Sequence, residues 1–219
     1  MLSGQSAGGN LAAAIALKLR DDEFQPAIKM QVLIYPVVQG LDFRLPSMIQ
    51  NDGLILERAG MAEAVGFYLE GNNNNKEAYL NNDHVSPAVK KMKVPYIDVT
   101  HLPSKYLVNY EKPSAETGND TMWNELKDKL LNPYFSPLVA DRLDGLPLSY
   151  MFTAKYDVLR DEGFLYAHRL RNAGIKVEHD HSEIGIHAML LFHESLPEAD
   201  VVFQKLIKFM VDNLYVWKP

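Results

Sequence analysis

The residues Gly4-Gln5-Ser6-Ala7-Gly8 place a serine between two glycines with the spacing of a nucleophile elbow, G-x-S-x-G. In such an elbow a sharp turn from a strand into a helix holds the serine hydroxyl clear of the backbone, and the glycines let the two elements approach closely. Residues 11–20 are strong helix formers with almost no polar face, which predicts a buried helix directly after the turn. The alternative is an ordinary helix start with Ser6 as its N-cap. We take Ser6 as the candidate nucleophile.

A carboxylate and a histidine follow two later predicted strands. Asp157 comes in the loop after the strand predicted at residues 148–153, the position where parallel sheets collect active-site groups. Asp161 falls in the first turn of the next helix, where its charge interacts favourably with the helix dipole, so we assign it a structural role. His187 lies in a glycine-containing loop before the final helix. The chain order of nucleophile, acid and base, Ser6, Asp157 and His187, is that of α/β-hydrolases.

The sequence contains seven histidines, which need to be separated by context. His179 and His181 share one face of a predicted strand and resemble an H-x-H metal pair, but no third ligand has a suitable spacing. The sequence therefore predicts no metal site, and no cofactor is expected. His187 combines a loop position with the correct place in chain order. The remaining histidines are expected on the surface, in packing or within helices: His84, His101, His168 and His193.

Elements of two kinds must position these side chains. Apolar or alternating runs alternate with amphipathic segments, which predicts a mostly parallel sheet with flanking helices and right-handed crossovers. The predicted strands are residues 30–35, 148–153 and 175–181, and the predicted helices after them are 160–173 and 197–214.

The pattern changes between residues 40 and 135. Amphipathic segments at 54–69 and 121–131 indicate helices, and we interpret the region as a cap insertion over the carboxyl ends of the strands. A second independent domain is the alternative, although neither flank resembles a flexible linker. We therefore predict one domain over residues 1–219. Met61, Val65 and Tyr68 form an apolar stripe that we interpret as packing, with an acyl pocket or a lipid-facing surface as the alternatives.

Composition limits the classes of function. The chain has 219 residues, 47% of them hydrophobic and 23% charged, as in an ordinary globular protein. Its net charge of −6 argues against a nucleic-acid partner. The absence of cysteine excludes disulfides and thiolate metal sites. No run has the length of a membrane span, and Met1 is not followed by a signal peptide.

Together these motifs resemble the hormone-sensitive-lipase group of α/β-hydrolases, and within it arylacetamide deacetylase and arylacetamide deacetylase-like proteins. The resemblance is spread in order over almost the whole chain. It rests on residues 4–10, Val32-Leu33-Ile34-Tyr35-Pro36, Asn132-Pro133-Tyr134-Phe135-Ser136-Pro137-Leu138, Gly145-Leu146-Pro147, residues 156–163 and Gly185-Ile186-His187.

The resemblance implies an α/β-hydrolase fold with a cap and hydrolysis of carboxylic esters or aryl amides of apolar small molecules, lipids included. It gives the catalytic roles to Ser6, Asp157 and His187 and makes the Ala7 amide an oxyanion donor. It also implies the lumenal side of the endoplasmic reticulum membrane, with which the glycosylation sequon Asn119-Asp120-Thr121 is compatible.

Three departures from the family pattern affect what we expect. Gln5 stands where the family usually has aspartate and Ile186 where it usually has phenylalanine, so we expect altered tuning. The family's His-Gly-Gly-Gly segment lies upstream of the elbow, and Ser6 is only the sixth residue of this chain. We therefore expect the C-terminal half of the fold with the N-terminal half of the sheet absent, and an open strand edge.

This expectation extends to activity. Because of the open strand edge, the isolated chain is expected to aggregate. With Ala7 as the sole oxyanion donor, it is expected to have negligible activity. Membrane association is expected only through an upstream anchor. The alternative to a serine hydrolase is a non-catalytic truncated product, or a pseudo-hydrolase that serves as a binding module.

Overall fold

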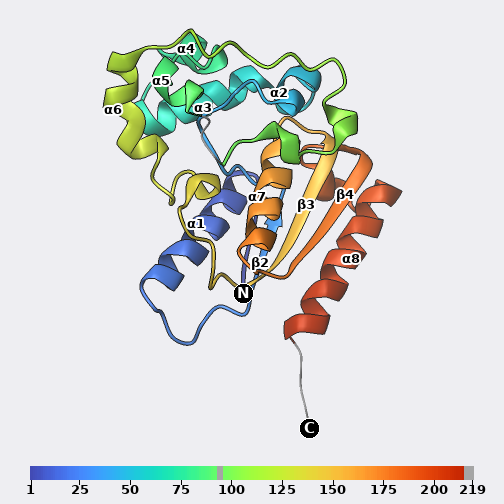
Figure 1. Ribbon diagram of the computed structural model, residues 1–219. Helices are drawn as coiled ribbons and strands as arrows, with labels where there is room; N and C mark the ends of the chain where they lie inside the picture. The colour runs from blue at the N-terminus through green and yellow to red at the C-terminus, as the bar shows by residue number, and fades with distance from the viewer. Residues whose placement is uncertain (93–95, 215–219) are drawn as a thin grey trace.

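A four-stranded parallel sheet forms the centre of the computed structural model, which describes residues 1–92 and 96–214 (Figure 1). The strands lie in the order β1-β2-β3-β4 and all pair in parallel. Their carboxyl ends therefore meet at one edge of the sheet, which is where open α/β sheets place their ligands. The strands are β1 (Leu2–Gln5), β2 (Met30–Ile34), β3 (Leu148–Tyr156) and β4 (Val177–Ile186).

Helices cover both faces of this sheet. α1 (Ala7–Asp21) and α7 (Arg160–Asn172) pack on one face, and α8 (Pro197–Leu214) packs on the other. Short 3₁₀ turns occupy Val99–His101, Ser104–Tyr106, Pro137–Val139 and Met189–Phe192. The parallel α/β architecture predicted from the alternation of strands and helices is confirmed.

Alternate residues of the central strands enter two separate cores. Leu33 and Met151 belong to the core under α1 and α7, whereas Val32 and Tyr150 belong to the core under α8. Because both faces are covered, these strands are apolar on both sides, which explains the continuous apolar runs in the sequence.

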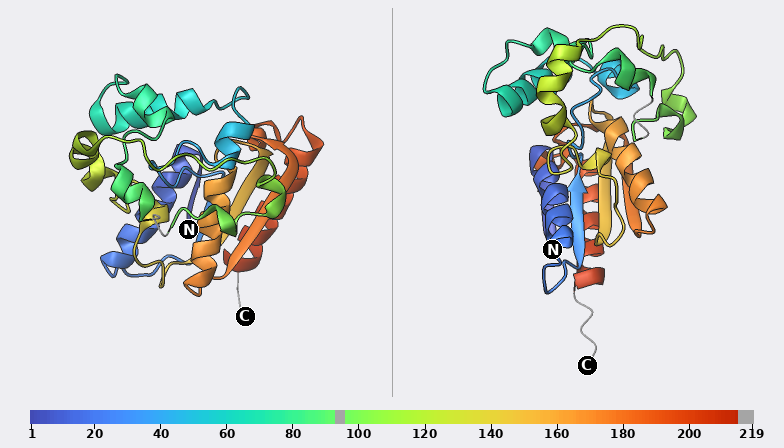
Figure 2. Two further views of the ribbon diagram at one scale, coloured as in Figure 1. Left: turned by 45° about the horizontal axis from the view of Figure 1, so that its top comes forward. Right: turned by 60° about the vertical axis from the view of Figure 1, so that its left-hand side comes forward.

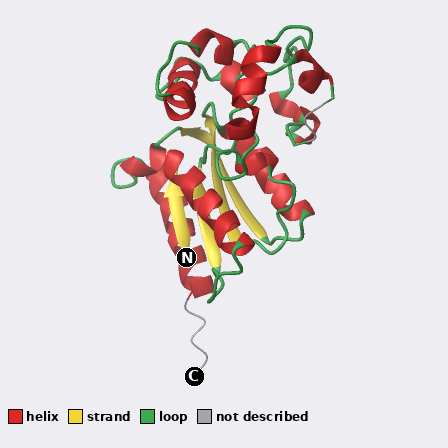
Figure 3. Cartoon of the chain, turned by 90° about the vertical axis from the view of Figure 1, so that its left-hand side faces the viewer, coloured by secondary structure: helices red, strands yellow, loops and turns green. Residues whose placement is uncertain are grey.

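A layer of helices lies beyond the carboxyl ends of the strands (Figures 1, 2 and 3). Residues 93–95 of the predicted insertion are outside the described residues, and the division into domain and cap stays a prediction. The helices of the layer are α2 (Pro46–Gln50), α3 (Arg58–Glu70), α4 (Lys76–Leu80), α5 (Pro87–Lys91) and α6 (Asp120–Leu130).

The stripe on α3 divides between core and surface. Met61 and Val65 are buried in the core, as the packing interpretation expects. Tyr68 is 70% exposed and stacks on the ring of Phe135 with ring centroids 5.2 Å apart. Within the part of the chain that the structure describes, no helix is both long enough and apolar enough to cross a bilayer.

Several element boundaries differ from those predicted. β3 continues to Tyr156 rather than ending at residue 153. α3 begins at Arg58 rather than near residue 54, because Asp52 Oδ1 accepts a hydrogen bond from the Arg58 amide (2.9 Å) and holds the preceding residues in a turn. β4 continues to Ile186 rather than ending near residue 181. Past an irregularity between Ala154 and Tyr156, Tyr156 still pairs with Ile186, so Gly185 lies in a strand and not in a loop.

The contact of α7 with β3 requires glycine at position 163. A Cβ at Gly163 would lie 2.6 Å from Thr153 Cγ2, whereas a Cβ at Gly60 of α3 would meet nothing within 4 Å. We expect Gly163→Ala to lower the free energy of unfolding by about 1–3 kcal/mol through overpacking. Gly60→Ala should raise it by up to about 1 kcal/mol through helix propensity. Urea denaturation of both variants measures the difference, and equal effects would contradict the close contact.

Candidate active site

Ser6 stands on the turn between β1 and α1. Its backbone angles are φ 52° and ψ −123°, and its side chain makes no capping hydrogen bond, so the N-cap alternative does not describe it. Space requires glycine at positions 4 and 9: a Cβ at Gly4 would lie 2.0 Å from the Gly8 carbonyl oxygen, and a Cβ at Gly9 would lie 2.8 Å from Pro36 Cβ. A Cβ at Gly8 would meet nothing within 4 Å. The local structure is that of the elbow the sequence predicts.

Asp157 is the first residue after β3 and is almost completely buried. Its Oδ1 accepts a hydrogen bond from the Leu159 amide (2.9 Å), which fixes the carboxylate plane. Its Oδ2 lies 2.8 Å from His187 Nδ1. A neutral imidazole that donates from Nδ1 to this carboxylate has Nε2 free to accept a proton.

His187 follows β4 and completes a continuous line of hydrogen bonds. Its Nε2 lies 3.1 Å from Ser6 Oγ, within reach for proton transfer. The three residues singled out from the sequence therefore meet at the carboxyl edge of the sheet, although 181 residues separate Ser6 from His187.

Ala7 is the first residue of α1. Amides in the first turn of a helix have no partner within the helix and carry the positive end of its dipole. The Ala7 N–H is therefore placed beside the nucleophile with the polarity that an oxyanion needs.

Several supporting residues were not identified from the sequence. The ring of Tyr35 lies 4.8 Å from that of His187. Asn51 donates through Nδ2 to the carbonyls of Lys155 and Asp157, both at 3.0 Å, and holds the loop that carries the acid. Asn10 donates to the Val37 and Phe135 carbonyls. Asn10 and Tyr35 lie within the motifs on which the family resemblance rests, and this position could have pointed to them. No feature of the sequence pointed to Asn51.

Charged groups lie buried at the start of α7, directly behind the acid. Arg160 Nε pairs with Asp161 Oδ1 at 2.8 Å, and Asp161 Oδ2 accepts from the Ser47 amide, which agrees with a structural role for Asp161. Glu162 accepts from the Val38 amide (2.7 Å) and from Gln39 Nε2 (2.9 Å). Burial raises the pKa of Glu162 to about 8, and the nearby charge of Asp157 adds to the increase.

Non-glycine residues with positive φ adjoin each part of the site. Ser6 (52°), Tyr35 (35°) and Ala188 (62°) all adopt this conformation. For a bulky side chain such as tyrosine it is a genuine outlier, maintained only where the surrounding structure imposes it. The site is therefore built on strained backbone.

Comparison with known proteins identifies the fold family. A family model described as alpha/beta hydrolase fold matches residues 1–112 and 84–191. The chain belongs to the α/β hydrolases. Its resemblance to the hormone-sensitive-lipase type is confirmed by the relatives it matches.

Two curated relatives illustrate the similarity of this α/β hydrolase. It is 39% identical over 198 residues to neutral cholesterol ester hydrolase 1 of Bos taurus, which covers 87% of this chain and 48% of the relative. It is 37% identical over 197 residues to arylacetamide deacetylase of Oryctolagus cuniculus, which covers 88% of this chain and 49% of the relative. The chain therefore spans about half the length of the curated relatives it matches.

A solved esterase structure is also similar to this chain and is also about twice as long as the matched part. The esterase of Pyrobaculum calidifontis superposes with a TM-score of 0.58 at 28% sequence identity, covering 93% of this chain and 49% of that one. The fold is thus shared with a solved esterase over nearly all of this α/β hydrolase.

His179 and His181 converge on a hydroxyl in this α/β hydrolase. His179 Nε2 and His181 Nδ1 each lie 2.8 Å from Thr153 Oγ1, and His181 Nε2 lies 2.7 Å from the Tyr106 hydroxyl. Burial lowers the pKa of His179 to about 3 and that of His181 to about 4, so both rings are neutral at pH 7. In residues 1–92 and 96–214, no group of three or more candidate ligands could hold a metal ion.

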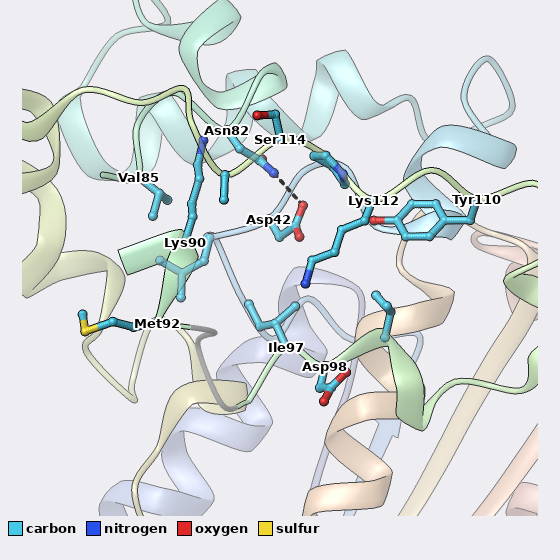
Figure 4. A pocket seen from close by; sticks show the side chains of 14 residues that line it. Asp42, Asn82, Val85, Lys90, Met92, Ile97, Asp98, Tyr110, Lys112 and Ser114 are labelled. Atoms are coloured by element: carbon cyan, nitrogen blue, oxygen red, sulfur yellow. Dashed lines mark hydrogen bonds between the residues drawn. The ribbon is translucent and has the colours of Figure 1, made fainter. Parts of the chain in front are cut away.

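The helical layer contains a cavity of about 370 Å³ away from the triad (Figure 4). Asp42 on its wall accepts a hydrogen bond from Asn82 Nδ2 at 2.7 Å, and Lys90 lies opposite apolar residues such as Ile97. Ser6, Asp157 and His187 are not among its lining residues, so the cavity is separate from the candidate site.

The half-buried His179 and His181 give this α/β hydrolase a stability that depends on pH. A histidine whose pKa is lowered in the folded state binds its proton more readily when unfolded, so the stability is present above pH 6.5 and is lost as the pH falls toward 4 and 3. We expect the free energy of unfolding to fall on acidification, each neutral histidine contributing up to about 1.4 kcal/mol per pH unit.

Denaturation between pH 7 and pH 4 measures this slope. His179→Gln should flatten it by up to about one proton, and His101→Gln, at an exposed position, serves as the matched control. An unchanged slope in His179→Gln would contradict a His179 ring that is neutral in the folded state.

Proposed function

We propose that the protein containing this chain is a serine hydrolase that cleaves carboxylic esters or aryl amides of apolar substrates. The observation that carries the proposal is the unbroken line from Asp157 Oδ2 through both nitrogens of His187 to Ser6 Oγ, at 2.8 and 3.1 Å. A nucleophile, a base and an orienting acid in this arrangement are recognised by geometry and role, whatever fold carries them.

In the proposed acylation, Ser6 Oγ attacks the carbonyl carbon of the substrate while His187 Nε2 accepts the hydroxyl proton. Asp157 keeps Nδ1–H directed toward itself and stabilises the imidazolium that forms. The tetrahedral intermediate then collapses: the bond from carbon to the leaving group breaks, and His187 returns its proton to the departing oxygen or nitrogen. The product of this half-reaction is an acyl ester on Ser6.

In deacylation a water attacks the acyl carbon while His187 takes one of its protons. The bond from the acyl carbon to Ser6 Oγ then breaks, His187 returns the proton to Oγ, and the carboxylic acid leaves. In both halves the Ala7 amide donates to the oxygen that becomes negative. A second donor, from the glycine segment that the resemblance implies, would complete the oxyanion hole. No step requires a metal or cofactor.

The proposed substrate class follows the relatives. A neutral cholesterol ester hydrolase and arylacetamide deacetylases are similar to this chain. The first name denotes an ester and the second an aryl amide as the compound that is cleaved. We assign the helices of residues 40–135 as a cap over the site, within a single domain, and propose a small-molecule ester or amide, lipids included, as the partner. By the same resemblance we place the protein on the lumenal side of the endoplasmic reticulum membrane.

Labelling with a fluorophosphonate tests the nucleophile. In protein expressed from the complete reading frame, we expect one labelled serine, Ser6, and loss of labelling in Ser6→Ala. Ser3→Ala, which removes an exposed hydroxyl of β1, is the matched control and should label normally. Persistent labelling of Ser6→Ala would refute the assignment of the nucleophile.

Turnover of a short-chain nitrophenyl ester tests the other two roles. Asp157→Asn should lower kcat by about 10⁴ because the imidazole adopts the wrong tautomer, and His187→Ala by at least as much. Normal folding with neither labelling nor turnover in the unchanged protein would favour a binding module instead.

A further inference from the structure

The ring of Tyr35 packs beside the imidazole of the candidate base, inclined to it. Its ring centroid is 4.8 Å from that of His187, with an angle of 55° between the planes. The two hydrogen bonds of His187, to Asp157 and Ser6, act in the plane of the imidazole. Neither hydrogen bond opposes rotation of the imidazole about the line that joins its two nitrogens. The inclined ring of Tyr35 beside it does oppose that rotation.

Both ends of Tyr35 are fixed. Its backbone amide donates to the Phe152 carbonyl (2.7 Å), and its hydroxyl donates to Gln5 Oε1 (2.8 Å). The side chain is buried, and burial, with a lesser effect of the Asp157 charge, raises the pKa of its phenol. The hydroxyl is therefore protonated at neutral pH and available as the donor to Gln5.

Together these contacts link Gln5, Ser6, His187 and Tyr35 in a closed ring. Gln5 is bonded covalently to Ser6, Ser6 Oγ lies on His187 Nε2, the His187 ring lies on Tyr35, and the Tyr35 hydroxyl returns to Gln5. We propose that Tyr35 and Gln5 are a positioning pair that holds the base in register with the nucleophile, and that the neutral amide of Gln5 keeps the acid limb of activity at low pH. This inference rests on the proposed hydrolase function.

The charge of the side chain at position 5 affects the protonation of His187. The titratable groups facing His187 are Asp157 from the loop after β3 and Tyr35 from the loop after β2, while Ser6 faces it from the elbow. The charge of Asp157 in turn helps to raise the pKa of Glu162 of α7. A carboxylate at position 5, held by the Tyr35 hydroxyl, would add a negative charge to this set and favour the protonated form of the base.

A double-mutant cycle tests the positioning role. Tyr35→Phe keeps the ring on His187 and removes the hydroxyl, and Gln5→Leu removes the acceptor. Each should lower kcat about three- to tenfold with KM little changed, because neither group touches substrate. The double variant should lose no more than either single one, since both remove the same contact.

Tyr150→Phe is the matched control for the cycle. It removes a buried tyrosine hydroxyl that donates to Asp180 Oδ2 (3.3 Å) in the core under α8, the same core that contains Tyr35. It should leave kcat within about twofold. An equal loss of kcat in Tyr150→Phe and Tyr35→Phe, or full additivity in the cycle, would overturn the positioning role.

The pH profile of kcat/KM tests the charge. Gln5→Glu preserves the acceptor and should move the midpoint of the acid limb upward by about 0.5–1 pH unit, partly screened because position 5 is exposed. In the Tyr35→Phe background the shift should disappear, because the new carboxylate is no longer held. An unmoved limb, or the same shift in both backgrounds, would refute this part.

Fluorophosphonate labelling of Ser6 distinguishes a failure of the positioning pair from a failure of the proposed hydrolase function. If Ser6 labels and the cycle or the pH profile fails, the positioning pair is wrong and the hydrolase stands. If Ser6 does not label in the unchanged protein, the proposed function fails first.

Discussion

The register of the parallel strands is the constraint on which the candidate site depends. Gln5 pairs with Ile34, and the next residues along the two strands are Ser6 and Tyr35. Tyr156 pairs with Ile186, and the next residues are Asp157 and His187. Ser6, Asp157, His187 and Tyr35 are thus each the first residue beyond a paired strand end. A slip of one residue in either pairing would turn these side chains to the opposite face and separate them.

The irregularity between Ala154 and Tyr156 has a specific consequence in this scheme. It breaks the regular pairing of β3 with β4 just before Asp157, while Tyr156 and Ile186 still pair. Irregularities of this kind re-aim side chains near active sites. Asn51 and the Leu159 amide then fix the loop and the carboxylate beyond it, so the orientation of Asp157 depends on the helical layer as well as on the sheet.

The sequence singled out three residues that the structure brings together, Ser6, Asp157 and His187. The elbow around Ser6, the strand-to-loop position of Asp157 and the chain order ending in His187 are local or ordinal signals, and the parallel sheet followed from apolar periodicity. Tyr35, Asn51 and Glu162 could not be assigned because their partners lie about 100 or more residues away or on another strand. The end of β4 was misplaced for the same reason: alternation along one strand does not reveal how far its neighbour extends.

The strained backbone explains why the site needs both cores of the molecule. Positive φ at Ser6, Tyr35 and Ala188 costs about 1–3 kcal/mol at each position, a total comparable with the net stability of a domain. Buried carboxyls behind the acid add a desolvation cost. These costs are offset by apolar packing on the two faces of β2 and β3, whose alternate residues fill the separate cores. Because β2 and β3 contribute residues to both cores, the geometry of the candidate site depends on the packing of both faces of the sheet.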